Sequence, residues 1–314
     1  MISVVMATYN GEKYIKAQLE SILRQSRKPD EIIINDDNSS DSTIHILETI
    51  KNTSDIIIDI QVNKLRLGYA RNFKQAIGRT RGEIIFLSDQ DDVWHEKKIE
   101  KCVNILDKND KILALSTGYY ITDSKLKGKK SSDRYKEGQI KKISWKKFMR
   151  HPKYPGMSMV FRRKIWSYIE IMDWKPNAAH DWMINQYAAS NDGMYYFSEK
   201  LVYYRQHETN TTGITIKQTD RNICNNRIKL INELIDANKS IEPDLDKAIY
   251  LKKMILFQTV RKKLLLEKRF FKLLIYEFLK IKYISVKSII GDMYVCLKNG
   301  RTSHVHNWSS DSHL

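Results

Sequence analysis

Short apolar runs rich in β-branched residues alternate with amphipathic segments of helical length through the first 125 residues of the chain. This alternation predicts strands and helices in turn. The expected strands cover residues 2–7, 31–35, 56–62, 83–88 and 112–122, and the expected helices cover residues 12–24, 41–51, 69–79 and 97–108. Apolar strands that alternate with helices are typical of an α/β protein whose parallel sheet is covered on both faces. Ligands of such sheets bind beyond the carboxyl ends of the strands, so we expect functional residues to follow the strands.

The pattern becomes less regular after residue 123. A stretch rich in Lys, Gly and Ser at residues 124–142 indicates a mobile loop. Further helices are expected at 145–150, 164–172 and from about 180, and further strands at 157–161, 194–197 and 201–204. Beyond about residue 220 the pattern is helical. We therefore expect an α/β domain over residues 1–218, with halves at about 1–123 and 124–218, followed by a helical region over residues 219–314.

The chain is strongly basic, with 54 Lys and Arg against 37 Asp and Glu and a net charge of +17. Such an excess points to an anionic partner: nucleic acid, an anionic membrane surface or a phosphorylated substrate. Residues 252–301 hold thirteen basic and three acidic residues, a difference of +10. Two explanations of this segment stay open. It is either a helical subdomain with solvated lysines or, as we favour, a face that lies on an anionic membrane leaflet.

The cysteines and the hydropathy pattern bear on location. Cys102, Cys224 and Cys296 are far apart and form neither a disulfide framework nor a metal-site spacing, which favours a reducing, cytosolic compartment. The first residues lack the basic segment and cleavage pattern of a signal peptide, so none is expected. A transmembrane helix is not expected either, because no run of about 18 apolar residues occurs.

Polar side chains follow three of the predicted strands. Residues 7–11 read ATYNG, residues 35–41 read NDDNSSD and residues 88–92 read SDQDD. The carboxylates of Asp89, Asp91 and Asp92 repel one another unless a cation or positive groups offset them. Mg²⁺ and Mn²⁺ prefer oxygen ligands of this kind, and either ion neutralises a diphosphate leaving group. Residues 36–41 have a simpler alternative, a helix cap within a solvated turn.

Four segments resemble, in order and spacing, the family 2 glycosyltransferases of the GT-A fold. They are residues 5–10 (VMATYN), 35–39 (NDDNS), 68–72 (GYARN) and 86–92 (FLSDQDD). The likeness covers about residues 2–210 and implies a mostly parallel sheet of GT-A type flanked by helices, with the basic helical region after it. Three further segments resemble the rhamnosyltransferase-like enzymes that build bacterial surface polysaccharides. They are residues 88–94 (SDQDDVW), 180–182 (HDW) and 204–207 (YRQH).

The resemblance implies a nucleotide site at the strand ends. Ala7 and Tyr9 would wall the nucleobase pocket, and Asp37 would hydrogen-bond a pyrimidine base. Arg71 would lie near the nucleotide. The same likeness makes the first half of the α/β domain the nucleotide-sugar half and the second half the acceptor half.

The resemblance also implies where the diphosphate and its metal bind. Asp89 and Asp91 would be the Asp-x-Asp pair, with Asp89 facing the nucleotide sugar and Asp91 holding Mg²⁺ or Mn²⁺. Gly156 would lie beside the donor sugar, where a glycine permits close approach of the backbone. Arg205 and His207 would meet the diphosphate or the metal, an ordinary surface loop being the alternative for both.

The resemblance also implies that Asp181 is the general base, at the start of a helix below the acceptor site. An inverting transfer needs a carboxylate opposite the leaving group to take the proton of the acceptor hydroxyl. The helix N-terminus favours the ionised form that a base requires. The alternative is that Asp181 only caps its helix. His180 is a further candidate as a partner of the base, although a lone histidine is more often structural.

Together these residues predict a metal-dependent inverting glycosyltransferase. The expected donor is a dTDP or UDP sugar, with rhamnose favoured, and the expected acceptor is a bacterial surface glycan or a lipid-linked oligosaccharide. The expected location is cytoplasmic and peripheral on the inner face of the cell membrane.

Three other classes stay as alternatives. A non-catalytic relative that binds nucleotide sugar or glycan should lack a metal or base carboxylate, whereas Asp89, Asp91 and Asp181 are all present. A nucleic-acid-binding protein explains the positive charge but not the acidic strand ends, so no nucleic-acid partner is expected. A nucleotidyltransferase needs a basic, glycine-rich phosphate loop, which residues 9–12 (YNGE) do not form.

Overall fold

The computed structural model describes residues 1–132, 135–150, 154–172, 174, 180–208, 245–267, 269–284 and 286–301. The chain divides into two compact units, Met1–Phe148 with Pro152–Ile214, and Met149–His151 with Thr215–Leu314. The domain boundary expected between residues 218 and 219 lies outside the described residues.

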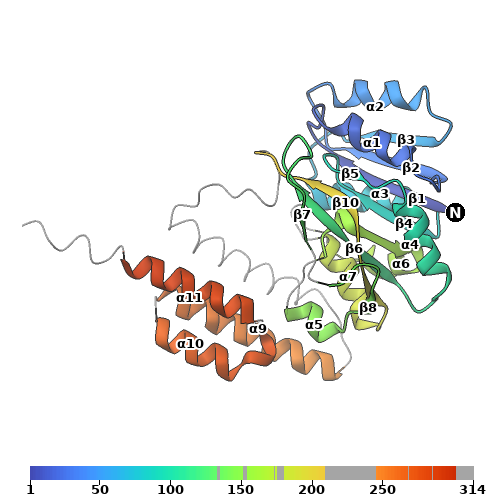
Figure 1. Ribbon diagram of the computed structural model, residues 1–314. Helices are drawn as coiled ribbons and strands as arrows, with labels where there is room; N and C mark the ends of the chain where they lie inside the picture. The colour runs from blue at the N-terminus through green and yellow to red at the C-terminus, as the bar shows by residue number, and fades with distance from the viewer. Residues whose placement is uncertain are drawn as a thin grey trace, which may run out of the picture. The chain divides into compact units, whose positions relative to one another are not determined.

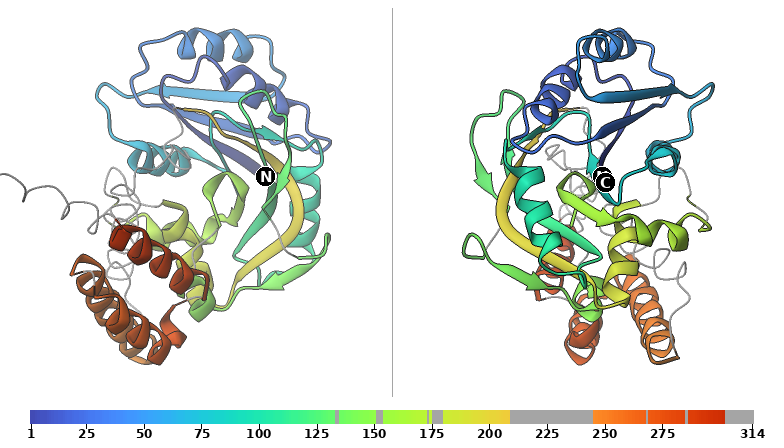
Figure 2. Two further views of the ribbon diagram at one scale, coloured as in Figure 1. Left: turned by 60° about the vertical axis from the view of Figure 1, so that its left-hand side comes forward. Right: turned by 90° about the vertical axis from the view of Figure 1, so that its right-hand side faces the viewer.

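Within these residues, ten strands form one sheet (Figure 1) in the order β3-β2-β1-β4-β9-β6-β10-β5, with β7 beside β6 and β8 beside β10. The strands are β1 (Ile2–Thr8), β2 (Glu31–Asp36), β3 (Ile57–Val62), β4 (Ile84–Ser88), β5 (Val93–Trp94), β6 (Ala114–Thr122), β7 (Lys130–Ser131), β8 (Ile140–Lys142), β9 (Met159–Arg162) and β10 (Met194–Arg205). The helices in this part of the chain are α1 (Ile15–Leu23), α2 (Thr43–Lys51), α3 (Tyr69–Arg79), α4 (Lys98–Asp107), α5 (Trp145–Arg150), α6 (Trp166–Ile169) and α7 (His180–Ser190), with 3₁₀ turns η1 (Gly156–Ser158) and η2 (Arg163–Ile165). Helices flank the sheet (Figures 1 and 2), so the expected α/β architecture is confirmed.

The first half of the sheet is parallel, as the alternation of strands and helices predicts. β1 pairs in parallel with both β2 and β4, and β2 pairs in parallel with β3. Every residue of β2 and β4 is buried, which explains why these strands read as continuous apolar runs. In the second half, β9 runs antiparallel between β4 and β6, whereas β6 and β10 are parallel. The complete sheet is therefore mixed.

Four local expectations differ from the structure. The two tyrosine-rich strands are one strand, β10, because residues 198–200 continue along β6 with an irregular register instead of turning. The loop expected at 124–142 contains β7 and β8, and the unexpected β5 pairs with β10. The helix expected at 164–172 is only the 3₁₀ turn η2 followed by α6. Short strands depend on partners far away in the sequence, which a local pattern does not report.

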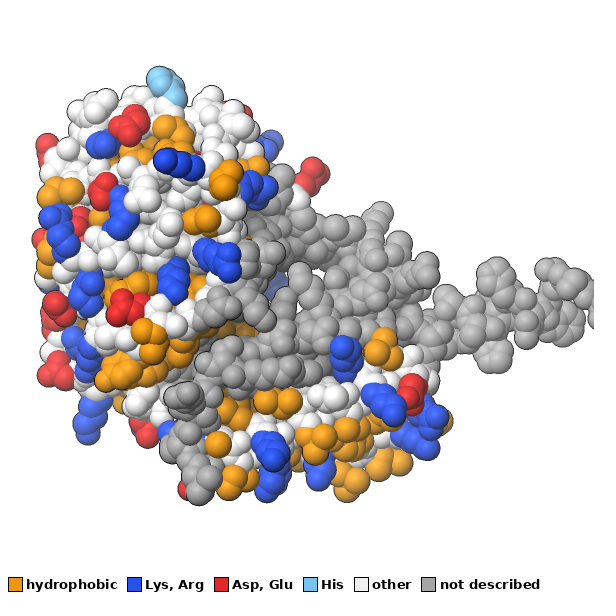
Figure 3. Space-filling view, turned by 180° about the vertical axis from the view of Figure 1, so that it is seen from behind, with side chains coloured by type: hydrophobic (Ala, Val, Ile, Leu, Met, Phe, Trp, Pro, Cys, Tyr) orange, Lys and Arg blue, Asp and Glu red, His pale blue; other side chains and the backbone are white. Residues whose placement is uncertain are grey.

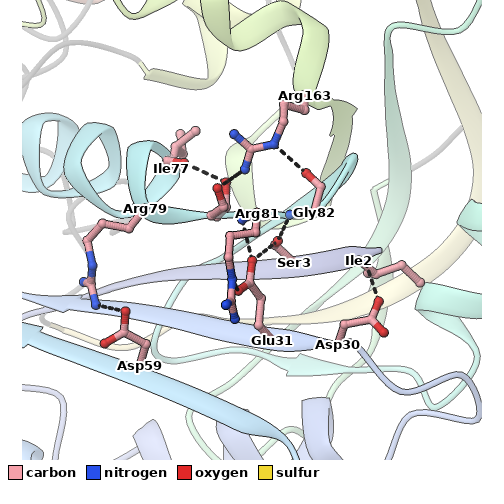
Figure 4. Close-up of polar contacts among 11 residues, drawn as sticks. Ile2, Ser3, Asp30, Glu31, Asp59, Ile77, Arg79, Arg81, Gly82 and Arg163 are labelled. Atoms are coloured by element: carbon pink, nitrogen blue, oxygen red, sulfur yellow. Dashed lines mark hydrogen bonds and ion pairs between the residues drawn. The ribbon is translucent and has the colours of Figure 1, made fainter.

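At the amino ends of the strands, polar and charged side chains pair with one another (Figure 4). Buried Glu31 accepts hydrogen bonds from the Ser3 hydroxyl (2.6 Å) and from Arg81 Nε (2.9 Å). Burial alone would raise the pKa of Glu31, but these hydrogen bonds hold it below its usual value. A Cβ on Gly82 would lie 2.5 Å from Ser3 Oγ, so the glycine lets the two segments approach. This end of the sheet is stabilised by satisfied polar groups and has a structural role.

The described part of the second unit is helical, as the sequence predicts for this region. It contains α9 (Leu245–Leu266), α10 (Phe270–Leu279), the 3₁₀ turn η3 (Ile281–Tyr283) and α11 (Val286–Arg301). Buried Arg261 of α9 forms ion pairs with Glu277 of α10 (Nε···Oε1 3.0 Å) and Asp292 of α11 (Nη2···Oδ2 2.6 Å). A buried ion cluster therefore joins the three helices. Over the described residues, no helix has the length and apolar character needed to cross a membrane.

Candidate functional site

The carboxyl ends of β1, β2 and β4 lie side by side, because β1 pairs in parallel with the other two strands. Tyr9, Asp37 and Asp89 come directly after these strands. Ala7 lies near the end of β1, where it pairs with Asn35 of β2. The topology thus brings the predicted nucleotide-sugar residues to one edge of the sheet.

Gln90 holds the loop that follows β1. Its Oε1 accepts a hydrogen bond from the Tyr9 N–H (2.9 Å), and its Nε2 donates to the Tyr9 carbonyl (3.0 Å). A Cβ on Gly11 would lie 2.5 Å from Gln90 Oε1, so only glycine leaves room for this amide. The Arg66 guanidinium lies over the Tyr9 ring, 3.7 Å from its centroid. Arg66 was not expected at this site.

Asp37 organises the turn that precedes α3. Its Oδ1 accepts hydrogen bonds from the Leu67 N–H (2.7 Å) and from Asn63 Nδ2 (3.1 Å), and its Oδ2 accepts from the Gly68 N–H (2.9 Å). Gly68 has a φ of 83°, a conformation that favours glycine. Both carboxylate oxygens therefore have partners within the protein, and the contact of Asp37 with a base stays a prediction.

The segment that begins at Gly68 continues into α3. Asn72 is buried, and its Nδ2 donates to the Asn35 carbonyl (2.7 Å), which ties the helix to the end of β2. Arg71 is exposed, and its Nε donates to the Trp174 carbonyl (2.7 Å). Arg71 therefore bridges α3 and the chain before α7, and its role near the nucleotide stays a prediction.

Three buried or half-buried carboxyl groups follow β4. Burial raises the pKa of Asp89 to about 7, and the charges of Asp91 and Asp181 add to this rise. Burial also raises the pKa of Asp92 well above its ordinary value. Asp92 Oδ1 accepts a hydrogen bond from the Arg205 N–H (3.0 Å), while its Oδ2 has no hydrogen-bond partner among the described residues. A nearby cation favours the ionised form of such carboxyl groups.

The end of β10 reaches the same cluster. His207 Nε2 lies 2.9 Å from Asp91 Oδ2, and the His207 ring packs on Tyr14 with centroids 4.5 Å apart. Arg205 is buried and donates through Nε to the Asp91 carbonyl (2.7 Å) and through Nη1 to the Ser124 carbonyl (2.7 Å). Arg205 therefore positions the backbone of the acidic loop, and His207 reaches a carboxylate side chain.

Asp181 is the second residue of α7, and its charge contributes to the raised pKa of Asp89. Its Oδ1 accepts a hydrogen bond from the Trp182 N–H (2.9 Å), and the Gly156 N–H also donates to this carboxylate. Burial raises the pKa of Asp181 to about 6, so burial outweighs the expected effect of the helix N-terminus. At pH 7 such a carboxylate is still mostly ionised, and it is a stronger base than an ordinary aspartate.

Gly156 and His180 support the start of α7. A Cβ on Gly156 would lie 2.8 Å from His180 Nε2, so the glycine permits close packing there. The His180 ring stacks on Phe73 with centroids 4.2 Å apart, and neither ring nitrogen has a hydrogen-bond partner in the described part of the chain. Burial lowers the pKa of His180 to about 3. These observations favour the structural alternative, a neutral packing residue.

Comparison with known proteins agrees with this arrangement. The family model for Glycosyl transferase family 2 matches residues 3–169. The dTDP-rhamnosyl transferase RfbG of Shigella flexneri is 31% identical over 227 residues, which cover 67% of this chain and 74% of RfbG. The chain belongs to glycosyl transferase family 2. It is therefore a nucleotide-sugar transferase, as its strand-end motifs predict.

Solved structures of other proteins share the fold of this glycosyltransferase. S. aureus TarS 1-349 in complex with UDP-GlcNAc aligns with a TM-score of 0.65 and 16% identity, covering 99% of this chain and 93% of that chain. The mannosyltransferase PcManGT from Pyrobaculum calidifontis, in complex with GDP-Man and Mn²⁺, aligns with a TM-score of 0.56 and 15% identity, covering 98% and 81%. The expected GT-A type of fold is confirmed.

Asp91 and His207 offer part of the ligand set that a divalent ion needs. Among the described residues, no group of three or more His, Cys, Asp and Glu side chains is arranged to hold a metal. Mg²⁺ usually binds through one or two carboxylates together with substrate phosphates and water. Asp91 Oδ2 and His207 Nε2 are 2.9 Å apart. Neighbouring ligands of one octahedral ion lie about 3 Å apart when each is about 2.1 Å from the metal.

A buried lysine, Lys98, lies beside this acidic cluster, where none was expected from the sequence. Its Nζ donates to the Met157 carbonyl (2.7 Å) and lies 3.5 Å from the centroid of the Trp94 ring. Burial lowers the pKa of Lys98 to about 7, and its charge opposes the rise in the pKa of Asp92. A lysine on the apolar face of the helix predicted at 97–108 is the sequence signal that could have identified it.

Proposed function

We propose that this family 2 enzyme is a metal-dependent, inverting glycosyltransferase that transfers rhamnose to a bacterial surface glycan or a lipid-linked oligosaccharide. One observation carries the proposal: the charge of Asp181, at the start of α7, acts on Asp89, the carboxyl group that directly follows β4. An inverting transfer needs a basic carboxylate on one side of the sugar and charge neutralisation at the leaving diphosphate on the other.

In the proposed reaction, Asp181 accepts the proton of the acceptor hydroxyl while that oxygen forms a bond to the anomeric carbon of the donor sugar. The bond between this carbon and the diphosphate breaks, and the diphosphate leaves with the electron pair. The Gly156 and Trp182 N–H groups orient the Asp181 carboxylate for this step. Asp91, Asp89 and His207 would hold a Mg²⁺ or Mn²⁺ ion, which neutralises charge on the diphosphate when bound.

The proposed donor pocket is formed at the ends of β1 and β2. Ala7 and Tyr9 wall the nucleobase, and Asp37 acts on the base directly or through the turn that it holds before α3. Arg71 and Arg205 are proposed to lie at the phosphates or at the loops that bind them. The name of the S. flexneri relative supports a dTDP-rhamnose donor, and the ligand of TarS makes UDP the second base to test.

The proposed location is the cytosolic face of a bacterial membrane. A lipid-linked acceptor lies at such a surface, and anionic lipids attract basic segments. The difference of +10 between basic and acidic residues over 252–301 supports this placement.

Thermal unfolding with a panel of nucleoside diphosphates, with and without Mn²⁺, tests the donor site. A ligand at 100 times its dissociation constant adds about 2.7 kcal/mol to the free energy of unfolding. We expect a Mn²⁺-dependent shift with dTDP or UDP that Asp91→Ala abolishes and Asp181→Asn preserves. The exposed Asp110→Ala variant is the control. No shift with any nucleotide would contradict the proposed donor.

Transfer of labelled rhamnose from dTDP-rhamnose to a lipid-linked glycan extract tests the reaction. The anomeric configuration of the product, read by NMR, distinguishes inversion from retention. A nucleotide shift without turnover of any donor would instead support a non-catalytic relative.

A further inference from the structure

Helix α10 buries its acidic residue and exposes its large apolar residues. Glu277 is fully buried, whereas Phe271, Ile275, Phe278 and Leu279 are 75%, 61%, 58% and 75% exposed. With about 3.6 residues per turn, these four side chains lie within an arc of about 100° on one side of the helix. We call them the α10 apolar face. A helix that faces water normally has the opposite arrangement.

The buried ion cluster explains this orientation. Arg261 pairs with Glu277 (3.0 Å) and Asp292 (2.6 Å), and its Nη1 donates to Gln258 Oε1 (3.0 Å). Turning α10 to bury its apolar face would pull Glu277 away from Arg261 and leave a buried cation with one partner fewer. The cluster therefore holds the α10 apolar face outward within the second unit.

The exposed charged side chains on α10 and in the turn after it are positive. Lys272, Lys280 and Lys282 are exposed on or just after α10, and the only acidic residue in the sequence from 270 to 283 is the buried Glu277. Apart from Arg261, Glu277 and Asp292, residues 252–301 hold twelve basic residues and one acidic residue. Hydrophobic and basic side chains of this unit lie next to one another in the lower right of Figure 3.

Exposed apolar side chains beside lysines favour some partners over others as the surface that covers the α10 apolar face. A second copy of the chain would bring the same lysines together in a two-fold interface, and like charges that meet in an interface are unfavourable. An anionic bilayer offers apolar chains to the phenylalanines and phosphates to the lysines.

We propose that the α10 apolar face docks on an anionic lipid bilayer. Phe271 and Phe278 enter the boundary between headgroups and acyl chains, and Lys272, Lys280 and Lys282 contact the lipid phosphates. This inference names the surface that would contact the membrane. Of the proposed function it depends only on the membrane location, and not on the donor site or the reaction.

Co-sedimentation of the full chain with vesicles tests the proposal. Vesicles of phosphatidylcholine with phosphatidylglycerol should bind the protein, and vesicles of phosphatidylcholine alone should bind it much less. The double variant Phe271→Ser with Phe278→Ser should bind at least about tenfold more weakly, because even partial burial of two phenylalanines contributes more than the free energy of a tenfold change. A triple Lys→Gln variant at 272, 280 and 282 should lose the preference for phosphatidylglycerol.

Matched variants and a second readout complete the test. Leu65→Ser with Ile171→Ser removes two exposed apolar side chains of the first unit and should leave vesicle binding unchanged. Equal binding by the wild type and the Phe271/Phe278 variant overturns the proposal. A dimer seen by light scattering that this variant dissociates, without vesicle binding, also overturns it and assigns the face to a second copy. The nucleotide-induced thermal shift, measured on the same samples, separates a failure of membrane docking from a failure of the donor site.

Discussion

Gln90 holds the backbone of Tyr9 through both functional groups of its amide, accepting from the Tyr9 N–H at 2.9 Å and donating to the Tyr9 carbonyl at 3.0 Å. Gln90 is the middle residue of the Asp-x-Asp segment, between Asp89 and Asp91. The loop proposed to bind the nucleobase and the loop proposed to bind the metal are therefore linked directly by hydrogen bonds. We expect the geometry of one loop to depend on the other.

Gly11→Ala should disrupt this link, because the new Cβ would lie 2.5 Å from Gln90 Oε1 and displace the amide from Tyr9. The loss of two hydrogen bonds should lower the free energy of unfolding by about 1–3 kcal/mol and donor affinity about tenfold. Calorimetric titration with nucleotide measures the affinity. Gly78→Ala, where the nearest atom would be 3.4 Å away in Trp166, is the control. The double variant Gly11→Ala with Gln90→Ala should bind nucleotide no more weakly than Gln90→Ala alone. Strictly additive losses of affinity would argue against a link between Gln90 and Tyr9.

Asp181→Asn should lower kcat by about 10²–10⁴-fold while nucleotide affinity stays within about twofold, since the proton acceptor is lost and the donor site is kept. We expect the pKa of Asp181, about 6, to determine the pH profile of the wild type. Activity should fall as the pH drops through about 6, because the protonated carboxyl group cannot accept the acceptor's proton. Initial rates between pH 5 and pH 8 check this. The exposed Asp55→Asn should retain the wild-type rate and profile.

The Asp181→Asn variant should have a higher free energy of unfolding than the wild type at pH 8. The pKa of Asp181 rises from 3.8 to about 6 on folding, so the folded state binds more protons than the unfolded state between these values. The contribution of Asp181 to the free energy of unfolding is therefore present at low pH and is lost as the pH rises through about 6. Asp181→Asn should therefore raise the free energy of unfolding by about 2–3 kcal/mol at pH 8 and much less at pH 4. Denaturant unfolding at the two pH values measures the difference, and an equal gain at both would contradict the pKa assignment.

Lys98→Met should destabilise the first unit by about 1–3 kcal/mol, because it leaves the buried Met157 carbonyl without its donor. The neighbouring Lys97 is exposed, so Lys97→Met should change the free energy of unfolding by less than about 0.5 kcal/mol. Denaturant titration of both variants compares them directly. Similar small effects would mean that the hydrogen bond from Lys98 to Met157 does not stabilise the first unit.

Arg261→Met should destabilise the second unit by about 3–5 kcal/mol, because Glu277 and Asp292 would remain buried without their cation. Replacing all three groups by apolar residues, as Arg261→Met with Glu277→Leu and Asp292→Leu, should recover most of this loss. Lys263→Met, at a side chain that is 74% exposed, is the matched control. Hydrogen exchange of the α9–α11 helices measures the loss within this unit.

Several features of the fold could be predicted because they depend on short stretches of chain. The strand–helix alternation up to residue 122 and the carboxylates of residues 88–92 follow from local hydrophobic period and residue type. Because parallel strands end at a common edge, the position of the acidic loop beside Tyr9 follows as well. The single strand β10 could not be predicted, since residues 198–200 are polar and their pairing with β6 involves residues about 80 positions away.

The sequence by itself thus determined the class of fold, the family and the edge of the sheet where polar groups gather. Only the tertiary structure decided the electrostatic character of those groups. The raised pKa of Asp181, the buried amine of Lys98 and the inward orientation of Glu277 all depend on desolvation and on partners remote in the chain. Hydrophobic periodicity acts over a few residues, whereas burial and ion pairing arise only when distant segments pack together.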